Sequence, residues 1–224
     1  METMGTITAL NGHQKNNNGH LWEHPMEPVA LIESSELSDE AKIKLISKHF
    51  KEIMLILGLD LEDDSLKDTP MRVAKMYVQE IFSGLNDKNK PAITLFENGY
   101  EYTEMLVEKN ISVYSTCEHH FVPITGKAHV AYYSSGKVIG LSKINRIVHY
   151  YCKRPQVQER LTVQIGKALQ EALKTEDVAV VIDAAHHCVA SRGICDGGSS
   201  TITSFYSGKF KKEEIKKEFL GSIK

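Results

Sequence analysis

The chain has 224 residues, of which 42% are hydrophobic and 25% charged, and its formal net charge is −2. This composition is typical of a folded globular protein, and the near-neutral charge gives no reason to expect nucleic acid or an anionic membrane as a partner. No apolar run approaches the roughly 20 residues of a membrane span. The first 20 residues lack a basic segment followed by an apolar one, so a secretory signal is not expected. The four cysteines do not form a disulfide framework, which favours a reducing cytoplasm.

Residues 1–30 are polar and irregular, and they predict a flexible N-terminal tail. The pattern becomes helical at Ser38, which is placed to cap a helix whose apolar stripe ends before Gly58. A second helix is predicted to follow, with Thr69 as its N-cap and Pro70 at its first position.

The region from residue 100 to 224 alternates between strand-like and helix-like patterns. Ser134, Ser135 and Gly136 form a turn signal between two strands, and Ser142 is placed to cap the helix after them. The predicted strands cover residues 103–114, 124–133, 137–141, 178–185 and 199–206. Two amphipathic helices lie between the third and fourth strands, and a charged helix ends the chain. This order predicts an α+β fold with an antiparallel sheet.

The stretch STCEHHFVP, residues 115–123, holds a cysteine, an acid and two adjacent histidines. Cys117 and His120 have Cys-x-x-His spacing, so a thiolate and an imidazole in one turn can converge on an ion. Cys188, in a second cluster that follows the strand 178–185, is the natural third ligand. Zinc prefers sulfur and nitrogen donors, and three protein ligands leave a fourth position for water.

Other interpretations of these residues stay open at the level of spacing. A buried cysteine is often a small hydrophobic residue that binds nothing. A closed structural zinc site needs a fourth ligand, and the candidates are His119, His186, His187 and Cys195. Cys152 lies in a helical pattern and is interpreted as a packing residue. Cys195 is interpreted as a loop thiol, and Glu118 has no role that spacing assigns.

Basic residues lie close in sequence to the metal candidates. In GLSKINR, residues 140–146, Ser142 opens a helix whose N-terminus would attract an anion, and Lys143 and Arg146 add two cations. Arg192 follows Cys188 by four residues. Arg72 and Lys75 form a further pair three residues apart on the second helix. Each pair alone is more often a solvated helix face, but together they favour a polyphosphate near a metal.

Gln158 and Glu159, in RPQVQERL, lie at a predicted helix start. A carboxylate there can accept two hydrogen bonds from the N1–H and N2–H₂ groups of a guanine, a pairing that rejects analogues strongly. An acid in the first turn of a helix is also favoured by the helix dipole alone. The residue types by themselves favour the second interpretation.

Five blocks along the chain resemble the GTP cyclohydrolase I family. The resemblance runs from about Leu37 to Leu220 and leaves the tail outside. The blocks are DTPMRVAKMYVQEIFSGL, STCEHHFVPITGKAHVAY, VIGLSKINRIV, RPQVQERLTVQI and HHCVASRGI. Residues 31–224 therefore resemble one catalytic domain, with N-terminal helices in 38–84 and a core in 100–224. One departure is Cys195, where many family members carry Arg.

The resemblance implies a fold, an assembly and a reaction. The fold is the tunnelling fold, in which antiparallel sheets of several subunits join into a barrel with helices outside. The assembly is a toroidal homodecamer with active sites at subunit boundaries. The reaction hydrolyses GTP to 7,8-dihydroneopterin triphosphate and formate with one Zn²⁺ per subunit, as the first step of tetrahydrofolate and pterin biosynthesis.

The resemblance also implies roles for the residues that match its motifs. The zinc ligands match Cys117, His120 and Cys188, and the zinc-activated water attacks C8 of the guanine. His186 matches the acid that protonates N7. The residues near the ribose match His119 and Ser142. The guanine-reading residues match Gln158 and Glu159. The triphosphate cations match Lys143, Arg146 and Arg192, and the cations from a neighbouring subunit match Arg72 and Lys75.

Three other classes of protein compete with this assignment. A pterin synthase or deazaguanine nitrile reductase of the same fold lacks this pairing of Cys-x-x-His and His-x-Cys blocks. A zinc nucleobase deaminase needs Cys-x-x-Cys, which does not occur here. A non-catalytic relative would be expected to lose His186, a zinc ligand or the phosphate cations.

Cys117 and Cys188 are also expected to lie close enough to form a disulfide if zinc is lost.

Overall fold

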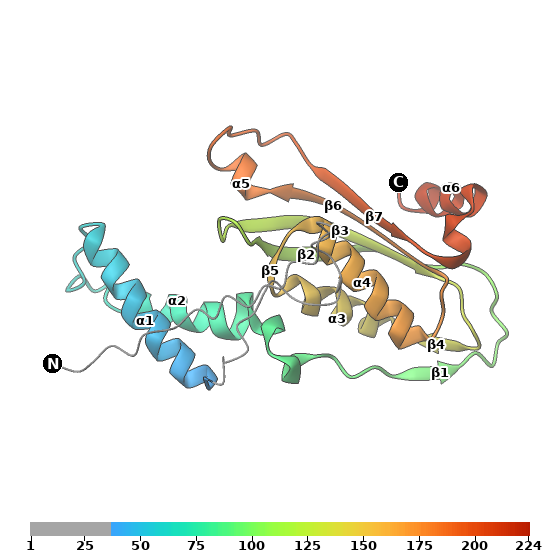
Figure 1. Ribbon diagram of the computed structural model, residues 1–224, viewed down its shortest axis with the longest axis horizontal. Helices are drawn as coiled ribbons and strands as arrows, with labels where there is room; N and C mark the ends of the chain where they lie inside the picture. The colour runs from blue at the N-terminus through green and yellow to red at the C-terminus, as the bar shows by residue number, and fades with distance from the viewer. Residues whose placement is uncertain (1–36) are drawn as a thin grey trace, which may run out of the picture.

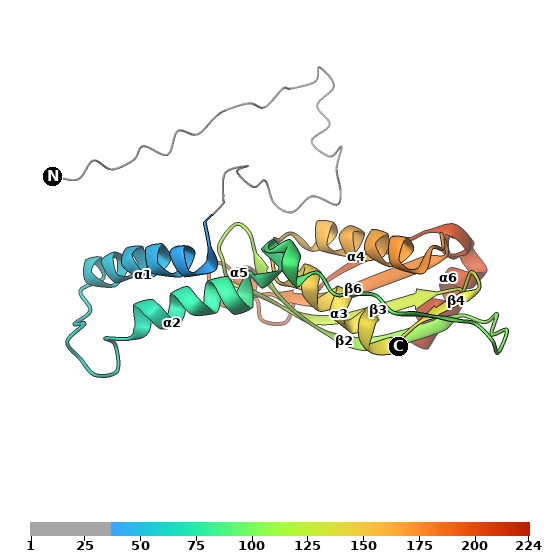
Figure 2. The same cartoon turned by 90° about the horizontal axis from the view of Figure 1, so that it is seen from below.

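The computed structural model describes residues 37–224, so the predicted tail over residues 1–30 lies outside the described residues. Figures 1 and 2 show two parts, a helical arm at the N-terminal side and a sheet covered by helices. We define the arm as residues 39–89. Within the described range, no helix combines the length and apolar character needed to cross a membrane.

The arm begins with α1, Asp39–Ile56. Its predicted cap is confirmed, because the Ser38 hydroxyl oxygen accepts from the Ala41 N–H at 3.2 Å. Gly58, with φ of +80°, follows the end of the helix in the left-handed conformation that glycine tolerates best.

The second helix of the arm, α2, differs from the prediction. It covers Thr69–Lys75, and its N-cap is Asp68 rather than Thr69, with no side-chain hydrogen bond at the cap. The chain then continues as a π-helical turn, Met76–Ile81, instead of a regular helix. Phe82, which follows this turn, contacts Phe121 in the loop 118–122, and the two ring centroids lie 5.2 Å apart.

Five strands form the main sheet, in the order β5-β2-β3-β6-β7, and their bounds are Pro155–Gln156, Leu106–Cys117, Pro123–Tyr132, Val178–His186 and Thr201–Tyr206. The predicted antiparallel arrangement is confirmed for the pairs β2–β3, β3–β6 and β6–β7. The short β5 pairs in parallel with β2. Two further strands, β1 (Leu95–Glu97) and β4 (Lys137–Ile139), pair only with each other.

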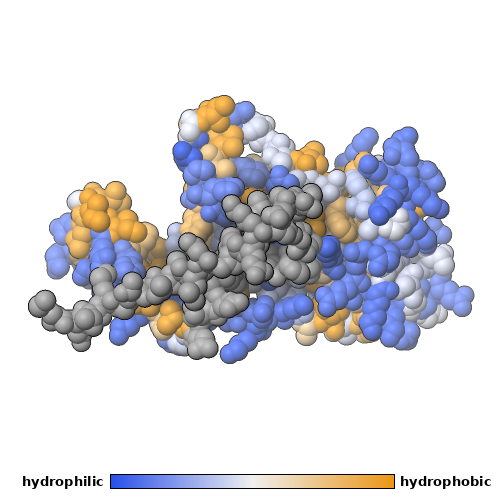
Figure 3. All heavy atoms as spheres, viewed as in Figure 1, coloured by the Kyte–Doolittle hydropathy of each residue, from blue (hydrophilic) through white to orange (hydrophobic). Residues whose placement is uncertain are grey.

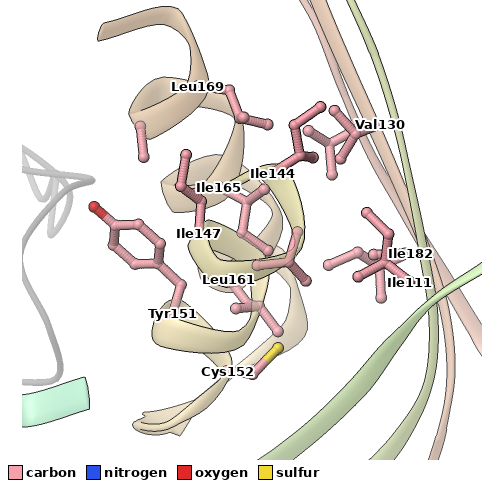
Figure 4. Packing of buried hydrophobic residues seen from close by; sticks show 14 of the residues in the cluster. Ile111, Val130, Ile144, Ile147, Tyr151, Cys152, Leu161, Ile165, Leu169 and Ile182 are labelled. Carbon is pink, nitrogen blue, oxygen red and sulfur yellow. The ribbon is translucent and has the colours of Figure 1, made fainter. Parts of the chain in front are cut away.

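Helices α3 (Leu141–Cys152) and α4 (Gln158–Leu173) cover one face of the main sheet, as Figure 4 shows. The sheet residues Ile111, Val130 and Ile182 point into this core. Because side chains alternate along a strand, their neighbours face the other side. There Ala131 and Val181 pack with Phe210 and with Phe219 of α6, Glu213–Ser222.

The first residues of α3 correct one prediction. The N-cap is Gly140, with no side-chain hydrogen bond, and Ser142 is the second residue of the helix rather than its cap. Its side chain is exposed. Ser142 therefore lies on the surface at the start of α3, and its side chain does not cap the helix.

Strand register defines two ends of the sheet. At the hairpin end, Thr116 pairs with Pro123 and with Pro155, and Ile124 pairs with His186. At the opposite end, which we call the β4 end, Leu106 pairs with Tyr132, and β4 follows. The twelve residues of β2 separate these ends by about 35 Å at ~3.3 Å per residue.

Hydrophobic side chains also lie exposed on the arm. Figure 3 shows them gathered at its outer tip, where α1 ends. Ile56 and Leu57 there are 85% and 70% exposed. Surface of this kind is common where two protein chains meet.

Candidate metal centre

The β2–β3 turn holds two of the predicted ligands in a fixed loop. Cys117 N–H donates to the Val122 carbonyl at 2.8 Å, and Phe121 N–H donates to the Cys117 carbonyl at 2.9 Å. Phe121 takes a positive φ of 53°, which closes the turn. The loop therefore keeps Cys117 and His120 on the same tight connection.

The third predicted ligand, Cys188, follows strand β6, which ends at the same end of the sheet. β6 finishes at His186, and α5, His187–Ala190, starts immediately after it and carries Cys188. The Sγ atoms of Cys117 and Cys188 and a ring nitrogen of His120 all lie within 4.8 Å of one another. This span is close to twice the zinc–sulfur distance of about 2.3 Å, so two thiolates and an imidazole here fit one zinc ion after small side-chain rotations.

The Cys117 thiol affects its neighbour Cys188. Both are free thiols. Burial, and then the neighbouring Cys117 thiol, raise the pKa of Cys188, while the Arg192 guanidinium lowers it slightly. Two thiolates held this close repel each other unless a cation lies between them, so the arrangement favours a bound metal.

The neighbouring histidine is not part of the three-residue group. His119 Nδ1 lies 3.8 Å from Cys117 Sγ, and its Nε2 lies 3.9 Å from the Glu118 carboxylate. The His119 side chain is 64% exposed. It therefore lies beside the candidate centre with most of its ring facing solvent.

Glu118, between the two ligands of the turn, is tied to α4. Arg160 donates two hydrogen bonds to its carboxylate, at 2.7 and 3.0 Å, and the two side chains are only 10% and 15% exposed. Glu118 N–H also donates to the Gln156 carbonyl at 3.1 Å. This bidentate pair fastens the metal-binding turn to the start of α4.

His186 is held by the same helix. Its Nε2 lies 2.7 Å from Oε1 of Gln158, whose side chain is buried with 1% exposed. Burial lowers the pKa of His186, and the nearby Glu159 carboxylate partly opposes this shift. Glu159 itself is exposed, so at the start of α4 one side chain points inward and the next points outward.

The predicted phosphate cations are spread over the molecule. Arg192 lies in the exposed loop after α5, close enough to Cys188 to affect its pKa. Ser142, Lys143 and Arg146 lie in the first turns of α3, which starts near the β4 end. The helix rises about 15 Å from Ser142 to its last residue at 1.5 Å per residue, so Ser142 is set back by that distance from the end of α3 that lies nearest the metal candidates.

Arg72 and Lys75 are also separate from the centre. Both are exposed on α2 in the arm. Arg72 forms only a loose ion pair with Asp68, at 3.6 Å. A solvated pair of this kind contributes little to stability, which leaves both cations available for a ligand or another chain.

Comparison with known proteins places this geometry in a family. A family model described as GTP cyclohydrolase I matches residues 46–224. The chain is 64% identical to GTP cyclohydrolase 1 of Flavobacterium johnsoniae over 189 residues. This matched region covers 84% of this chain and 85% of the relative. It is 53% identical over 203 residues to GTP cyclohydrolase 1 of Vibrio parahaemolyticus, covering 90% and 91%. The chain belongs to the GTP cyclohydrolase I family.

Family membership confirms the resemblance drawn from the five sequence blocks and the prediction of a GTP cyclohydrolase I enzyme. The α+β architecture with an antiparallel sheet is compatible with the family fold. A solved structure of the archaeosine synthase QueF-Like in the apo form overlaps 48% of this chain at a TM-score of 0.41 and 18% identity.

Sequence reasoning missed several residues that hold the site together. Arg160 had no predicted role, although it directly follows Glu159 in the block RPQVQERL. Thr201 and Thr203 on β7 contact the Gln158 amide, and only the sheet order brings them there. His187, without a predicted role, lies 3.1 Å from Thr125 Oγ1 and so ties α5 to β3.

The remaining cysteines lie outside the centre. Cys152 is buried in α3, as predicted for a packing residue, and burial raises its pKa to about 12. Cys195 is exposed in the loop 191–200, with φ of +55°. Its position agrees with the interpretation as a loop thiol.

Proposed function

We propose that the chain hydrolyses GTP to 7,8-dihydroneopterin triphosphate and formate at a zinc centre held by Cys117, His120 and Cys188. The convergence of these three side chains, from a hairpin and from a distant strand end, carries the proposal. When bound, the ion supplies Lewis acidity and an activated water for attack on C8 of the guanine. The chain itself must then bind the nucleotide, orient it and deliver protons.

His186 is proposed to protonate N7 of the guanine while the imidazole ring opens. Its Nε2 is hydrogen-bonded to Gln158, so the ring would give the proton from Nδ1 in its imidazolium form and return to the neutral Nε2–H form. An imidazole has a pKa suited to this exchange near neutral pH. His119 and Ser142 are proposed to act at the ribose during ring opening, rearrangement and closure.

Binding energy is proposed to come from both ends of the nucleotide. The exposed Glu159 carboxylate, close to His186, is placed to accept from the guanine N1–H and N2–H₂ groups. Arg192 is available to a phosphate near Cys188. The triphosphate does not react, so its contacts serve to hold the base against the metal.

The remaining proposed substrate residues require a second copy of the chain. Ser142, Lys143 and Arg146 lie toward the β4 end, and Arg72 and Lys75 lie on the arm, away from the centre of their own chain. A homo-oligomer, a decamer in the resemblance, would bring them to a neighbour's centre. The exposed apolar tip of the arm supports such contacts. Cytoplasmic localisation stays a prediction.

Incubation of zinc-loaded protein with GTP tests the proposal, with formate and an oxidised fluorescent pterin as readouts. Absence of both products would refute it. His186→Ala is expected to lose turnover and keep zinc, whereas Glu159→Ala is expected to lose GTP binding. Metal content of His119→Ala against His120→Ala separates the two neighbours, because only the second is expected to lose zinc.

A further inference from the structure

The side chain of Gln158 is buried and fully engaged within its own chain, which does not fit its expected contact with a guanine. Only 1% of the residue is exposed. Its amide Nε2 lies 2.8 Å from the Thr201 carbonyl and 3.1 Å from the Ile182 carbonyl. Its Oε1 lies 2.7 Å from His186 Nε2. Both polar atoms of this buried side chain are therefore engaged by groups of its own chain.

Neighbouring hydroxyls fix which way the amide faces. Thr162 Oγ1 donates to the main-chain carbonyl of Gln158 at 2.8 Å, so the hydrogen of the Thr162 hydroxyl is used. The Thr203 hydroxyl, 2.6 Å away, must then donate to Thr162 Oγ1. Thr203 Oγ1 is left as an acceptor for Gln158 Nε2 at 3.1 Å. A flipped amide would direct its oxygen at two carbonyls, which cannot donate.

The orientation of the amide determines the tautomer of His186. An amide oxygen only accepts, so His186 Nε2 must carry a hydrogen. In the neutral ring the second nitrogen, Nδ1, then has the free lone pair, so Nδ1 is the nitrogen that takes up a proton and gives it from the imidazolium form. Within residues 37–224, no hydrogen bond to His186 Nδ1 is present.

We propose that Gln158 is a positioning residue that acts through His186: it holds the ring by its Nε2–H group and leaves Nδ1 as the nitrogen that faces the substrate. The inference rests on the proposed function, because His186 is assigned there as the proton donor. The two neighbouring residues at the start of α4, Gln158 and Glu159, thereby have different roles. Glu159 contacts the guanine, and Gln158 positions the ring of His186.

The test replaces Gln158 with methionine, which keeps the length of the side chain and removes its polar atoms. We expect kcat for GTP to fall about 10- to 100-fold, the scale of a misplaced proton donor, with KM within about 3-fold and zinc content unchanged. A raised KM with unchanged kcat would overturn the inference, since it would mean that Gln158 binds the base.

A matched control is Gln164→Met. Gln164 is also a fully buried glutamine of α4, and its Oε1 accepts from Gln156 rather than from the histidine. We expect this variant to keep kcat. Equal losses of kcat in both variants would show a general packing effect and would contradict a specific role for Gln158.

A double-mutant cycle separates action through His186 from independent action. In a His186→Ala background, Gln158→Met is expected to cause no further fall in the residual turnover. A second loss of the same size would overturn the inference. If Gln158→Met does not fold, Thr203→Val serves instead, because it keeps the shape of the side chain and removes the hydroxyl that accepts from the amide and donates to Thr162.

A spectroscopic readout keeps the inference separate from the proposed function. Long-range ¹H–¹⁵N spectra of protein labelled in histidine, assigned with His186→Ala, report the tautomer without turnover. We expect the Nε2–H tautomer in the unsubstituted protein and a mixture in Gln158→Met. An Nδ1–H tautomer in the unsubstituted protein would refute the inference, whereas inactivity toward GTP with the expected tautomer would refute only the proposed function.

Discussion

The candidate site residues at the hairpin end of the sheet contact one another, whereas those toward the β4 end are exposed and separate. At the hairpin end, Cys117, His120 and Cys188 converge within one chain and are braced by the Glu118–Arg160 ion pair. Toward the β4 end, Ser142 and Arg146 are exposed on α3 with no partner group from the centre. One end holds the candidate metal centre, and the other presents exposed side chains that are proposed to bind substrate.

This difference is what is expected if one chain carries parts of two separate sites, as proposed above. Ser142 lies ten residues before the end of α3, a rise of about 15 Å at 1.5 Å per residue, which is farther than its short side chain can reach. A second copy can join the two parts if its β4 end meets the hairpin end of the first. Contacts between unlike surfaces of this kind close into rings when the rotation between copies allows it.

The largest expected effect comes from removing the metal site at the hairpin end. Cys188→Ala is expected to lose zinc and to lower GTP turnover by about 10³-fold or more, because water is no longer activated. Elemental analysis and the formate assay measure the two effects. Cys152→Ala is the control, since this thiol is buried among packing residues and should leave zinc content unchanged. Zinc retained at full stoichiometry in Cys188→Ala would exclude this ligand.

The comparison of the two ends is tested directly by complementation. Lys143→Ala and Cys188→Ala should each be inactive alone, because each removes one half of the proposed site. When they are coexpressed, about a quarter of the sites in random mixed oligomers combine two intact halves, and turnover should recover toward that fraction. No recovery in verified mixed oligomers would show that each chain completes its own site.

A smaller effect is expected from loosening the metal-binding turn. Glu118→Gln removes the charge that pairs with Arg160, and we expect zinc affinity to fall about 10-fold, as for other groups that orient metal ligands. Competition with a zinc chelator measures this change. The control is Glu97→Gln, because Glu97 forms an exposed ion pair with Lys137. Equal affinity in both variants would remove the bracing role of Glu118.

The smallest effect concerns the sheet away from either end. His129 on β3 is buried, and burial lowers its pKa, while the Asp183 carboxylate partly opposes this and Lys109 adds to it. The unfolded chain therefore binds a proton at higher pH than the folded one, so stability falls as pH drops below about 6.5. His129→Gln should reduce the fall in Tm between pH 7 and 5 by about 2–4 °C.

Exposed His49 provides the comparison for that measurement, since its side chain is 63% accessible. His49→Gln is expected to follow the pH dependence of the unsubstituted protein. If His129→Gln also follows it unchanged, then His129 does not contribute to acid destabilisation.

Local features were predictable where neighbouring residues decide them. The Ser38 cap and the Cys117–His120 pair each depend on residues within a single turn of chain. Prediction failed at Thr69 and at the regular continuation of α2, because the cap is Asp68 and a π-helical turn interrupts the helix. Several residues can occupy a cap position with similar energy, so sequence rules leave helix ends uncertain by a residue or two.

The sequence by itself determined the family, the order of elements and the types of residue available to a zinc site. Only the tertiary structure decided where those residues meet. The register of β3 with β6 brings Cys188 to Cys117, and the order β6-β7 turns Gln158 inward to His186. The course of α3 places Lys143 away from both. Such long-range placements depend on strand register and layer packing, which no local pattern of residues specifies.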